Sequence, residues 1–256
     1  MVNRKAVRDA EKLYDTRISS KMDAVDAAGQ WGSKDGVGET CEEICSKIGI
    51  KKEDWVLEVG CGSGVLGSHL QTKCAFYCGF DVSNLMLKKF VDEYGSKCTC
   101  NLIQSVTDLI PLRNNLFDVV IMNSVTMYLH DQELLENTLV EIERVSTTNA
   151  TIFIGDNIIP SGYYWELAWF QNLPAVLKPL AKPYIRIRKW IADKSPKLTG
   201  KWKSLHREIS PEFVKMFFEG RAEIRQSNAA VYTVRQRILG RKYKGNRRVD
   251  FLITLK

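Results

Sequence analysis

One short stretch combines residue types that are suited to binding a nucleotide-like cofactor. Residues 55–59 are apolar except for Glu58, and glycines follow at positions 60, 62, 64 and 67. Closely spaced glycines let the backbone turn sharply and approach a ligand, whose polar atoms can meet the N–H groups of a following helix. Residues 55–67 therefore indicate a strand, a cofactor-binding turn and the start of a helix.

Two loop patterns fit this stretch. The glycines at 62, 64 and 67 match the G-x-G-x-x-G spacing of dinucleotide-binding proteins. The E-x-G-x-G-x-G spacing, which starts at Glu58, closely resembles the cofactor loop of class I methyltransferases that depend on S-adenosylmethionine (SAM), of the methyltransferase-11/25-like type that acts on small molecules. The resemblance implies that SAM is bound by Glu58, Gly60, Cys61, Gly62 and Gly64.

Asp81 follows the next predicted strand, residues 75–80. Its separation from the glycine loop, roughly 20 residues, suits an acid that accepts hydrogen bonds from ribose hydroxyls. As a helix N-cap it competes poorly with Ser83, which is better placed before the helix predicted over residues 85–94. Residues 80–87 also resemble the segment after the second strand in these methyltransferases, and Val82 is included in the expected cofactor site.

The third predicted strand, around residues 101–104, departs from the family pattern. Such enzymes usually have a Gly-Asp-Ala type turn here that contacts adenine, whereas this chain has Ser-Val-Thr-Asp at 105–108. The adenine amino group is therefore expected to meet Ser105, Asp108 or the backbone near Val106. Asn123 ends a buried fourth strand that starts at Phe117, and ligands bind at such carboxyl ends in open α/β sheets.

Methyl transfer is an in-line displacement on an activated carbon, so the protein mainly positions donor and acceptor. A general base helps when the acceptor is a hydroxyl. His206 is the leading candidate for that base, followed by His130 and Tyr128, and Asp156 is a further one; a structural role is the alternative for each. The aromatic residues expected to contact the substrate, or else to pack as a lid, are Tyr14, Trp31, Tyr163, Tyr164 and Trp165.

The elements that position these residues indicate an α/β fold. We expect one domain with a Rossmann-like, mostly parallel seven-stranded sheet, helices on both faces and an antiparallel last strand. Its parts are an N-terminal helical cap (1–50), a SAM-binding core (51–156), a helical insertion after strand five that serves as a substrate lid (157–209), and the end of the sheet (210–256). The seven cysteines are scattered without zinc-ligand spacing, so we expect no metal site and reduced, mostly buried thiols.

Charge is distributed unevenly along the chain. From Lys178 to Lys256 there are 21 Lys and Arg against 6 Asp and Glu, whereas residues 1–177 carry 16 against 24. Such a basic part suits an anionic membrane surface, nucleic acid or a phosphorylated substrate, or it is simply solvated. Without an apolar signal segment or a run of about 18 apolar residues, the chain is expected to be cytoplasmic, with peripheral membrane contact through residues 178–203.

The predicted function is that of a SAM-dependent methyltransferase, with S-adenosylhomocysteine as product and a small-molecule, lipid-linked or glycan-linked, anionic acceptor methylated at oxygen or nitrogen. RNA methylation ranks second, because Asn123 is followed by Ser-Val-Thr and not by the Pro-Pro-aromatic turn of enzymes that act on base amines. A non-catalytic SAM-binding module is a third reading, and an oxidoreductase ranks last.

Overall fold

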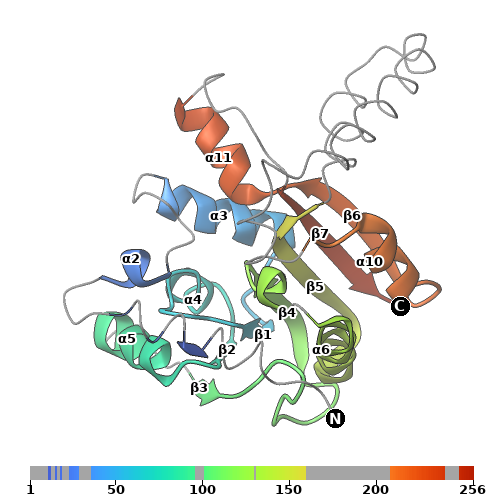
Figure 1. Ribbon diagram of the computed structural model, residues 1–256, viewed down its shortest axis with the longest axis horizontal. Coiled ribbons are helices and arrows are strands. Elements are labelled where there is room, and N and C mark those ends of the chain that lie inside the picture. Colours follow the sequence, from blue (N-terminus) through green and yellow to red (C-terminus); the bar gives the residue numbers. More distant parts are fainter. Residues whose placement is uncertain are drawn as a thin grey trace.

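The computed structural model describes residues 11, 12, 15, 18, 23–28, 36–95, 101–129, 131–159, 208–239 and 248–256. Within these residues, seven strands form one sheet in the order β3-β2-β1-β4-β5-β7-β6 (Figure 1). The strands are β1 Trp55–Val59, β2 Phe76–Asp81, β3 Asn101–Gln104, β4 Phe117–Asn123, β5 Ser146–Ile158, β6 Ala222–Asn228 and β7 Arg248–Leu255. The predicted seven-stranded α/β sheet is confirmed.

The first five strands run parallel, and β7 is antiparallel to both β5 and β6. The register pairs Val59 with Phe80 and Asn123 with Gly155. Parallel pairing therefore brings the carboxyl ends of β1, β2 and β4 to one edge of the sheet, which is the edge where open α/β sheets bind ligands.

Helices cover both faces of the sheet (Figure 1). Helices α3, Val37–Ile48, and α5, Asn84–Tyr94, lie on one side together with the short helices α2, Ala24–Ala28, and α4, Gly67–Leu70. On the other side lie α6, Gln132–Val145, and α10, Pro211–Phe217. Two buried apolar clusters result, one beneath α6 and α10 and one beneath α3, α4 and α5.

Side-chain caps fix where three of these helices begin. Ser83 accepts from the backbone N–H of Met86 at the start of α5, and Asp131 does the same for the N–H groups of residues 133 and 134 at the start of α6. Ser210 caps α10, whose first position is Pro211. A capping side chain satisfies a backbone donor that has no partner inside the helix, so these starts are encoded locally.

The structure has one helix between the last two strands that the sequence analysis does not predict. Residues 230–239 form a helix, α11, which packs on α3. Ala230 and Val234 are buried at helical spacing, a pattern that the many neighbouring cationic residues obscured. The strand β5 also extends through Ile158, two residues into the predicted lid, and the lid residues 160–207 lie outside the described part of the chain.

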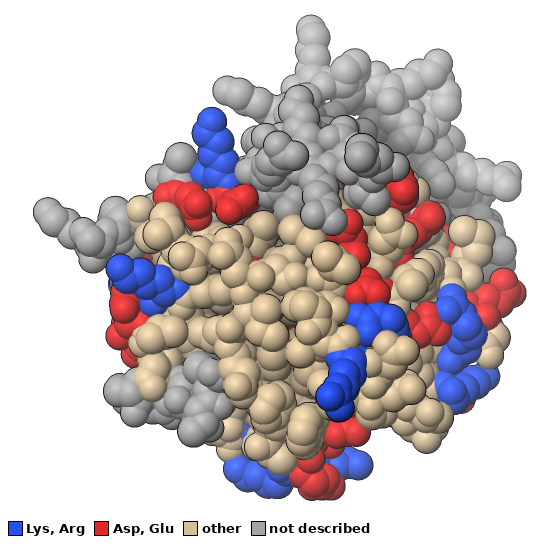
Figure 2. All heavy atoms as spheres, turned by 90° about the horizontal axis from the view of Figure 1, so that it is seen from below, with Lys and Arg blue, Asp and Glu red and all other residues tan. Residues whose placement is uncertain are grey.

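None of the described helices is long and apolar enough to cross a membrane. On the face of the molecule seen in Figure 2, acidic and basic side chains of the described residues are interspersed around a broad uncharged area. The described part of this face therefore shows no region of a single charge sign.

Candidate functional site

A cavity lies at the carboxyl edge of the sheet, between the ends of β1, β2 and β4. Its space is about 900 Å³ including the part open to solvent. The residues that line it are Ala28, Glu58, Gly60, Cys61, Gly62, Ser63, Val65, Leu66, Phe80, Asp81, Val82, Met86, Val106, Thr107, Asn123, Ser124, Val125, Tyr128 and Leu129. Most of the predicted cofactor residues therefore meet at one cavity.

The glycine turn forms one wall of this cavity. The N–H groups of Gly60 and Cys61 both donate to the carbonyl of Phe80, at 2.8 and 3.0 Å, which ties the turn to the end of β2. Gly62 has a φ of 53° and open space where a Cβ would stand, so its backbone is available to a ligand. Gly64, at a φ of 81°, does not line the cavity, because a Cβ there would overlap the ring of Phe90. Its role is close packing on α5.

Asp81 joins the glycine turn to the start of α5. Its carboxylate accepts from the N–H of Gly62 at 2.9 Å and from the N–H of Ser83 at 2.9 Å. Burial of the side chain, which is 9% exposed, raises the pKa of this carboxyl, while the backbone donors oppose that rise. These two bonds hold the carboxylate at the cavity wall, where an acid that accepts from ribose hydroxyls is needed.

Glu58 lies deeper in the same wall and is 4% exposed. Burial raises the pKa of its carboxyl to about 8, and the charge of Asp81 adds to this rise. The hydroxyl of Tyr77 donates to the Glu58 carboxylate at 2.6 Å and works in the opposite direction. A carboxylate in this position suits a cationic part of a ligand, since an opposite charge would restore its ionised form.

The segment after β3 contains the residues that are expected to contact adenine. Val106 and Thr107 line the cavity, and the hydroxyl of Thr107 is 2.8 Å from that of Thr138 on α6. Ser105 does not line it, because its hydroxyl donates to the carbonyl of Leu109 at 2.8 Å. Asp108 also lies off the cavity, although one of its carboxylate oxygens is buried and has no hydrogen-bond partner in the described part of the chain. Of the expected contacts, Val106 is therefore the one at the cavity.

The end of β4 and the short 3-10 helix Thr126–Tyr128 form the opposite wall. Tyr128 lines the cavity, as expected of a residue near the reacting groups, and so does Asn123. The remaining residues predicted for catalysis and substrate binding lie outside the described residues: Tyr14, Trp31, His130, Tyr163, Tyr164, Trp165 and His206.

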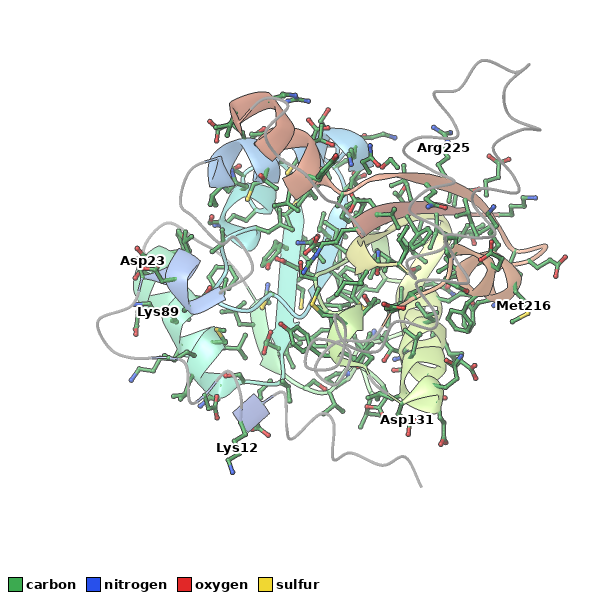
Figure 3. The ribbon with its side chains drawn as sticks, turned by 45° about the horizontal axis from the view of Figure 1, so that its top comes forward. Lys12, Asp23, Lys89, Asp131, Met216 and Arg225 are labelled. Carbon is green, nitrogen blue, oxygen red and sulfur yellow. The ribbon has the colours of Figure 1, made fainter. Side chains whose placement is uncertain are left out.

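The N-terminal cap reaches the site through two hydrogen bonds. Ser63 donates to the carbonyl of Ala24 at 2.5 Å, and Ser83 donates to the carboxylate of Asp15 at 2.6 Å. Helix α2, which follows Asp23, packs against α5, the helix that carries Lys89 (Figure 3). The described N-terminal residues thus lie along the cofactor side of the cavity, and Ala28 is part of its wall.

Several lining residues were not predicted from the sequence. Leu66, Met86, Thr107, Ser124 and Leu129 each lie within a few residues of a recognised motif. In the sequence, these residues are marked only by their closeness to the motifs. Helix and turn geometry decide which of the nearby side chains face the cavity.

The described residues of the glycine turn favour ligand binding over thiol or metal chemistry. The described cysteines carry free thiols, and burial raises the pKa of Cys61 well above its usual value. Within the described residues, no group of three His, Cys, Asp or Glu could hold a metal ion. A buried thiol with a raised pKa is a poor nucleophile, and Cys61 lines the cavity as part of the glycine turn.

These features fit SAM. Asp81 would accept from the ribose, Gly60 and Gly62 would pass closely beneath the methionine part, and Glu58 would face its ammonium group. When bound, SAM supplies a methyl group on a positively charged sulfur, which a nucleophile can attack directly. The protein's own residues therefore need only to bind, orient and exclude water.

The comparisons with known proteins agree with this fit. A family profile described as a methyltransferase domain matches residues 57–154, which span the glycine turn through β5. A search of curated proteins found no matching sequence.

Many solved structures share the fold. Phosphoethanolamine N-methyltransferase 1 of Haemonchus contortus, in complex with phosphoethanolamine and S-adenosylhomocysteine, has a TM-score of 0.69 and 12% identity over 100% of this chain and 50% of its own. The present chain thus spans half the length of that enzyme. The N-methyltransferase NodS of Bradyrhizobium japonicum, in complex with S-adenosylhomocysteine, has a TM-score of 0.59 and 10% identity over 96% of this chain and 97% of its own.

The YcgJ protein of Bacillus subtilis has a TM-score of 0.56 and 14% identity, over 86% of this chain and 98% of its own. At such identities the likeness concerns the fold. The matched profile and the strand order show that residues 57–154 form a methyltransferase domain and that the sheet has the fold of class I SAM-dependent methyltransferases.

Proposed function

We propose that the protein transfers the methyl group of SAM to a small-molecule or lipid-linked acceptor, at an oxygen or a nitrogen atom. The observation that carries this proposal is the lining of the cavity, in which Asp81 and Glu58 occur together with Asn123 and Tyr128. The carboxylates suit the ribose and the ammonium group of the cofactor. Asn123 and Tyr128 are further polar side chains that an acceptor could contact.

The similar structures guide the choice of acceptors to test first. The Haemonchus contortus protein is named as a phosphoethanolamine N-methyltransferase, and NodS as an N-methyltransferase. Small amines therefore come first among the candidates, ahead of small alcohols and lipid headgroups. Tyr128 is the described candidate for holding the acceptor's proton-bearing group, and His130 and His206 stay as proposals for the general base.

Calorimetry tests the cofactor part of the proposal. Asp81→Ala should weaken binding of SAM and S-adenosylhomocysteine by about 1–3 kcal/mol, because it removes the charged partner of the ribose hydroxyls. Ser105→Ala is the matched control, since its side chain lies off the cavity and should leave the affinity unchanged. Equal affinity of Asp81→Ala and wild type would overturn the assignment.

Transfer itself is tested with tritium-labelled SAM and a panel of ethanolamine, phosphoethanolamine, histamine and a total lipid extract. Labelled product from any of these supports the proposal. Binding of SAM without transfer to the panel or to RNA would favour a non-catalytic module, and transfer to RNA alone would replace the proposed acceptor class.

A further inference from the structure

A second, smaller cavity lies beside the cofactor cavity. Asn123 and Ser124, at the end of β4, line both cavities. The other walls of the smaller one are formed by Asp156 of β5, by Thr40 and Ile44 of α3, and by the start of α11. Two residues of one strand end thus separate the two spaces, and α11, which connects β6 to β7, closes the smaller one.

Backbone strain marks the two strand ends that meet here. Ser124 has a φ of 59° and Asp156 has a φ of 57°, both in the left-handed region that residues with a side chain rarely adopt. The N–H of Ser124 donates to the carbonyl of Gly155 at 3.0 Å, and its hydroxyl donates to the Asp156 carboxylate at 2.5 Å. Such conformations persist where surrounding structure enforces them, and they cluster at functional sites.

A network of charges holds Asp156 in place. Arg248 of β7 pairs with the Asp156 carboxylate, and the backbone N–H of Asp156 donates to Asp250 at 2.9 Å. Asp250 in turn pairs with Lys47 of α3 at 2.8 Å and accepts from the N–H of Ala230 at 2.9 Å. Each carboxylate therefore has its own cation, and four elements are fixed around the cavity.

The composition of the walls defines what the cavity can hold. Polar residues (Thr40, Asn123, Ser124 and Asp156) and apolar ones (Ile44, Ala230 and Val231) both line it. A carboxylate such as that of Asp156 only accepts hydrogen bonds, so it selects groups that carry N–H or O–H donors. The cavity is narrow, so it has room for a single small group such as an amine or a hydroxyl and not for a whole acceptor molecule.

We propose that this second cavity is the acceptor subsite, in which Asp156, oriented by Ser124 and Arg248, binds an amine or hydroxyl group of the methyl acceptor. This inference rests on the proposed methyltransferase function and names the residues that select its substrate. The shared wall places the subsite next to the cofactor cavity, and the strained strand ends and the charge network keep its geometry rigid.

Asp156→Asn tests the role of the charge without disturbing the backbone, because Asn tolerates the left-handed conformation. With an acceptor found by the tritium assay, this variant should raise the acceptor KM by at least about tenfold, the loss expected for a hydrogen bond to a charged group. Binding of S-adenosylhomocysteine by calorimetry should stay unchanged. Ala230→Leu, which fills the apolar side of the cavity, should reduce transfer in the same way.

Asp118→Asn is the matched control. It removes a carboxylate at the start of β4 that accepts from the backbone N–H of Trp55 at 3.0 Å and lines neither cavity, so the melting temperature should fall while the acceptor KM stays that of wild type. Rescue by Asp156→Glu would show a need for the charge, whereas a merely structural role would show as equal effects of Asp156→Asn and Asp118→Asn on stability and on KM.

The outcomes separate this inference from the proposed function. Wild-type transfer together with unchanged KM in Asp156→Asn and in Ala230→Leu would overturn the acceptor subsite alone. Loss of S-adenosylhomocysteine binding in Asp156→Asn would also overturn it, because the residue would then belong to the cofactor site. Wild-type binding of SAM without transfer to any acceptor would overturn the proposed function, and the subsite with it.

Discussion

Two buried carboxylates in one cavity are given different environments by their neighbours. Asp81 receives two backbone N–H donors from elements that flank it, whereas Glu58 receives one hydroxyl from Tyr77 and is otherwise desolvated. Backbone donors favour the charged form of an acid, and desolvation disfavours it. The two acids of the motif are thus suited to different parts of the cofactor, Asp81 to neutral hydroxyls and Glu58 to a cation.

Glu58 predicts a dependence of stability on pH. Its carboxyl titrates near 4.5 without the fold and at about 8 within it, so the folded protein binds more protons between these values. Stability should therefore fall as the pH rises through this window, by at most about 1.4 kcal/mol per pH unit from this group. Urea denaturation of the ligand-free protein at several pH values measures the slope.

Glu58→Gln is the control for that measurement. The amide keeps the shape of the side chain and cannot ionise, so the free energy of unfolding should depend less on pH than in wild type. The same slope in both proteins would contradict the assignment of the raised pKa to Glu58.

Substitutions at Gly62 and Gly64 should have different effects. Gly62→Ala should place a methyl group in the open space of the turn and weaken SAM binding, with a cost to folding of about 1–2 kcal/mol from its left-handed backbone. Gly64→Ala should instead destabilise the fold more strongly, because its methyl group would overlap the ring of Phe90. Melting temperatures and calorimetry on both variants check this; an unchanged SAM affinity in Gly62→Ala would count against it.

At the scale of elements, one arginine attaches the adenine-side segment to helix α6. Arg144 donates to the carbonyls of Ile110 and Leu112 at 2.8 and 2.9 Å and pairs with Glu141 at 2.7 Å. Glu141 also accepts from the N–H of Ile110 at 2.8 Å. These bonds hold the turn whose earlier residues, Val106 and Thr107, line the cofactor cavity.

Arg144→Ala should therefore affect both stability and cofactor binding. Because it leaves two carbonyls and a carboxylate without their partner, we expect a loss of about 2 kcal/mol in the free energy of unfolding. SAM affinity should fall as well, since Val106 and Thr107 would be less well positioned. Arg113→Ala, at an exposed position of the same segment, should change neither quantity in thermal melts and calorimetry. Full SAM affinity in Arg144→Ala would show that the segment holds its position without α6.

At the scale of the whole molecule, the chain combines a sheet that binds the cofactor with a strongly basic final third. The described part presents mixed charges on the face in Figure 2, and many of the basic residues after position 177 lie outside the described residues. In the sequence, Asn123 is followed by Ser-Val-Thr and not by the Pro-Pro-aromatic turn of enzymes that act on base amines, which speaks against nucleic acid as the partner. An anionic membrane surface is therefore our proposed partner.

Sedimentation with anionic vesicles tests that partner. Neutralising five basic residues should reduce binding, more clearly at low salt, because a surface attraction of this kind is screened by ions. These residues are Lys178, Lys182, Arg186, Arg188 and Lys189. SAM binding should be unchanged in this variant. If the wild-type protein does not sediment with the vesicles but binds RNA with a steep salt dependence, RNA replaces the membrane surface as the proposed partner.

Structural features that depend on interactions between residues close in the sequence could be predicted from the sequence alone. The glycine turn, Asp81 and the caps at Ser83 and Ser210 act on backbone groups within a few residues, so residue type and spacing determine them. The apolar runs of the central strands likewise predicted the sheet, because parallel strands are buried on both faces.

Tertiary structure decided the rest, since it depends on contacts between distant segments. The hydroxyl of Ser105 donates to the carbonyl of Leu109, and Thr107 lines the cavity in its place. Ser124 and Asp156 are 32 positions apart in sequence, yet parallel pairing sets them side by side with Arg248. Helix α11 forms by packing on α3, within a basic segment for which the sequence predicted no helix. Only the folded chain brings these groups together, because side-chain direction and strand register are set by packing.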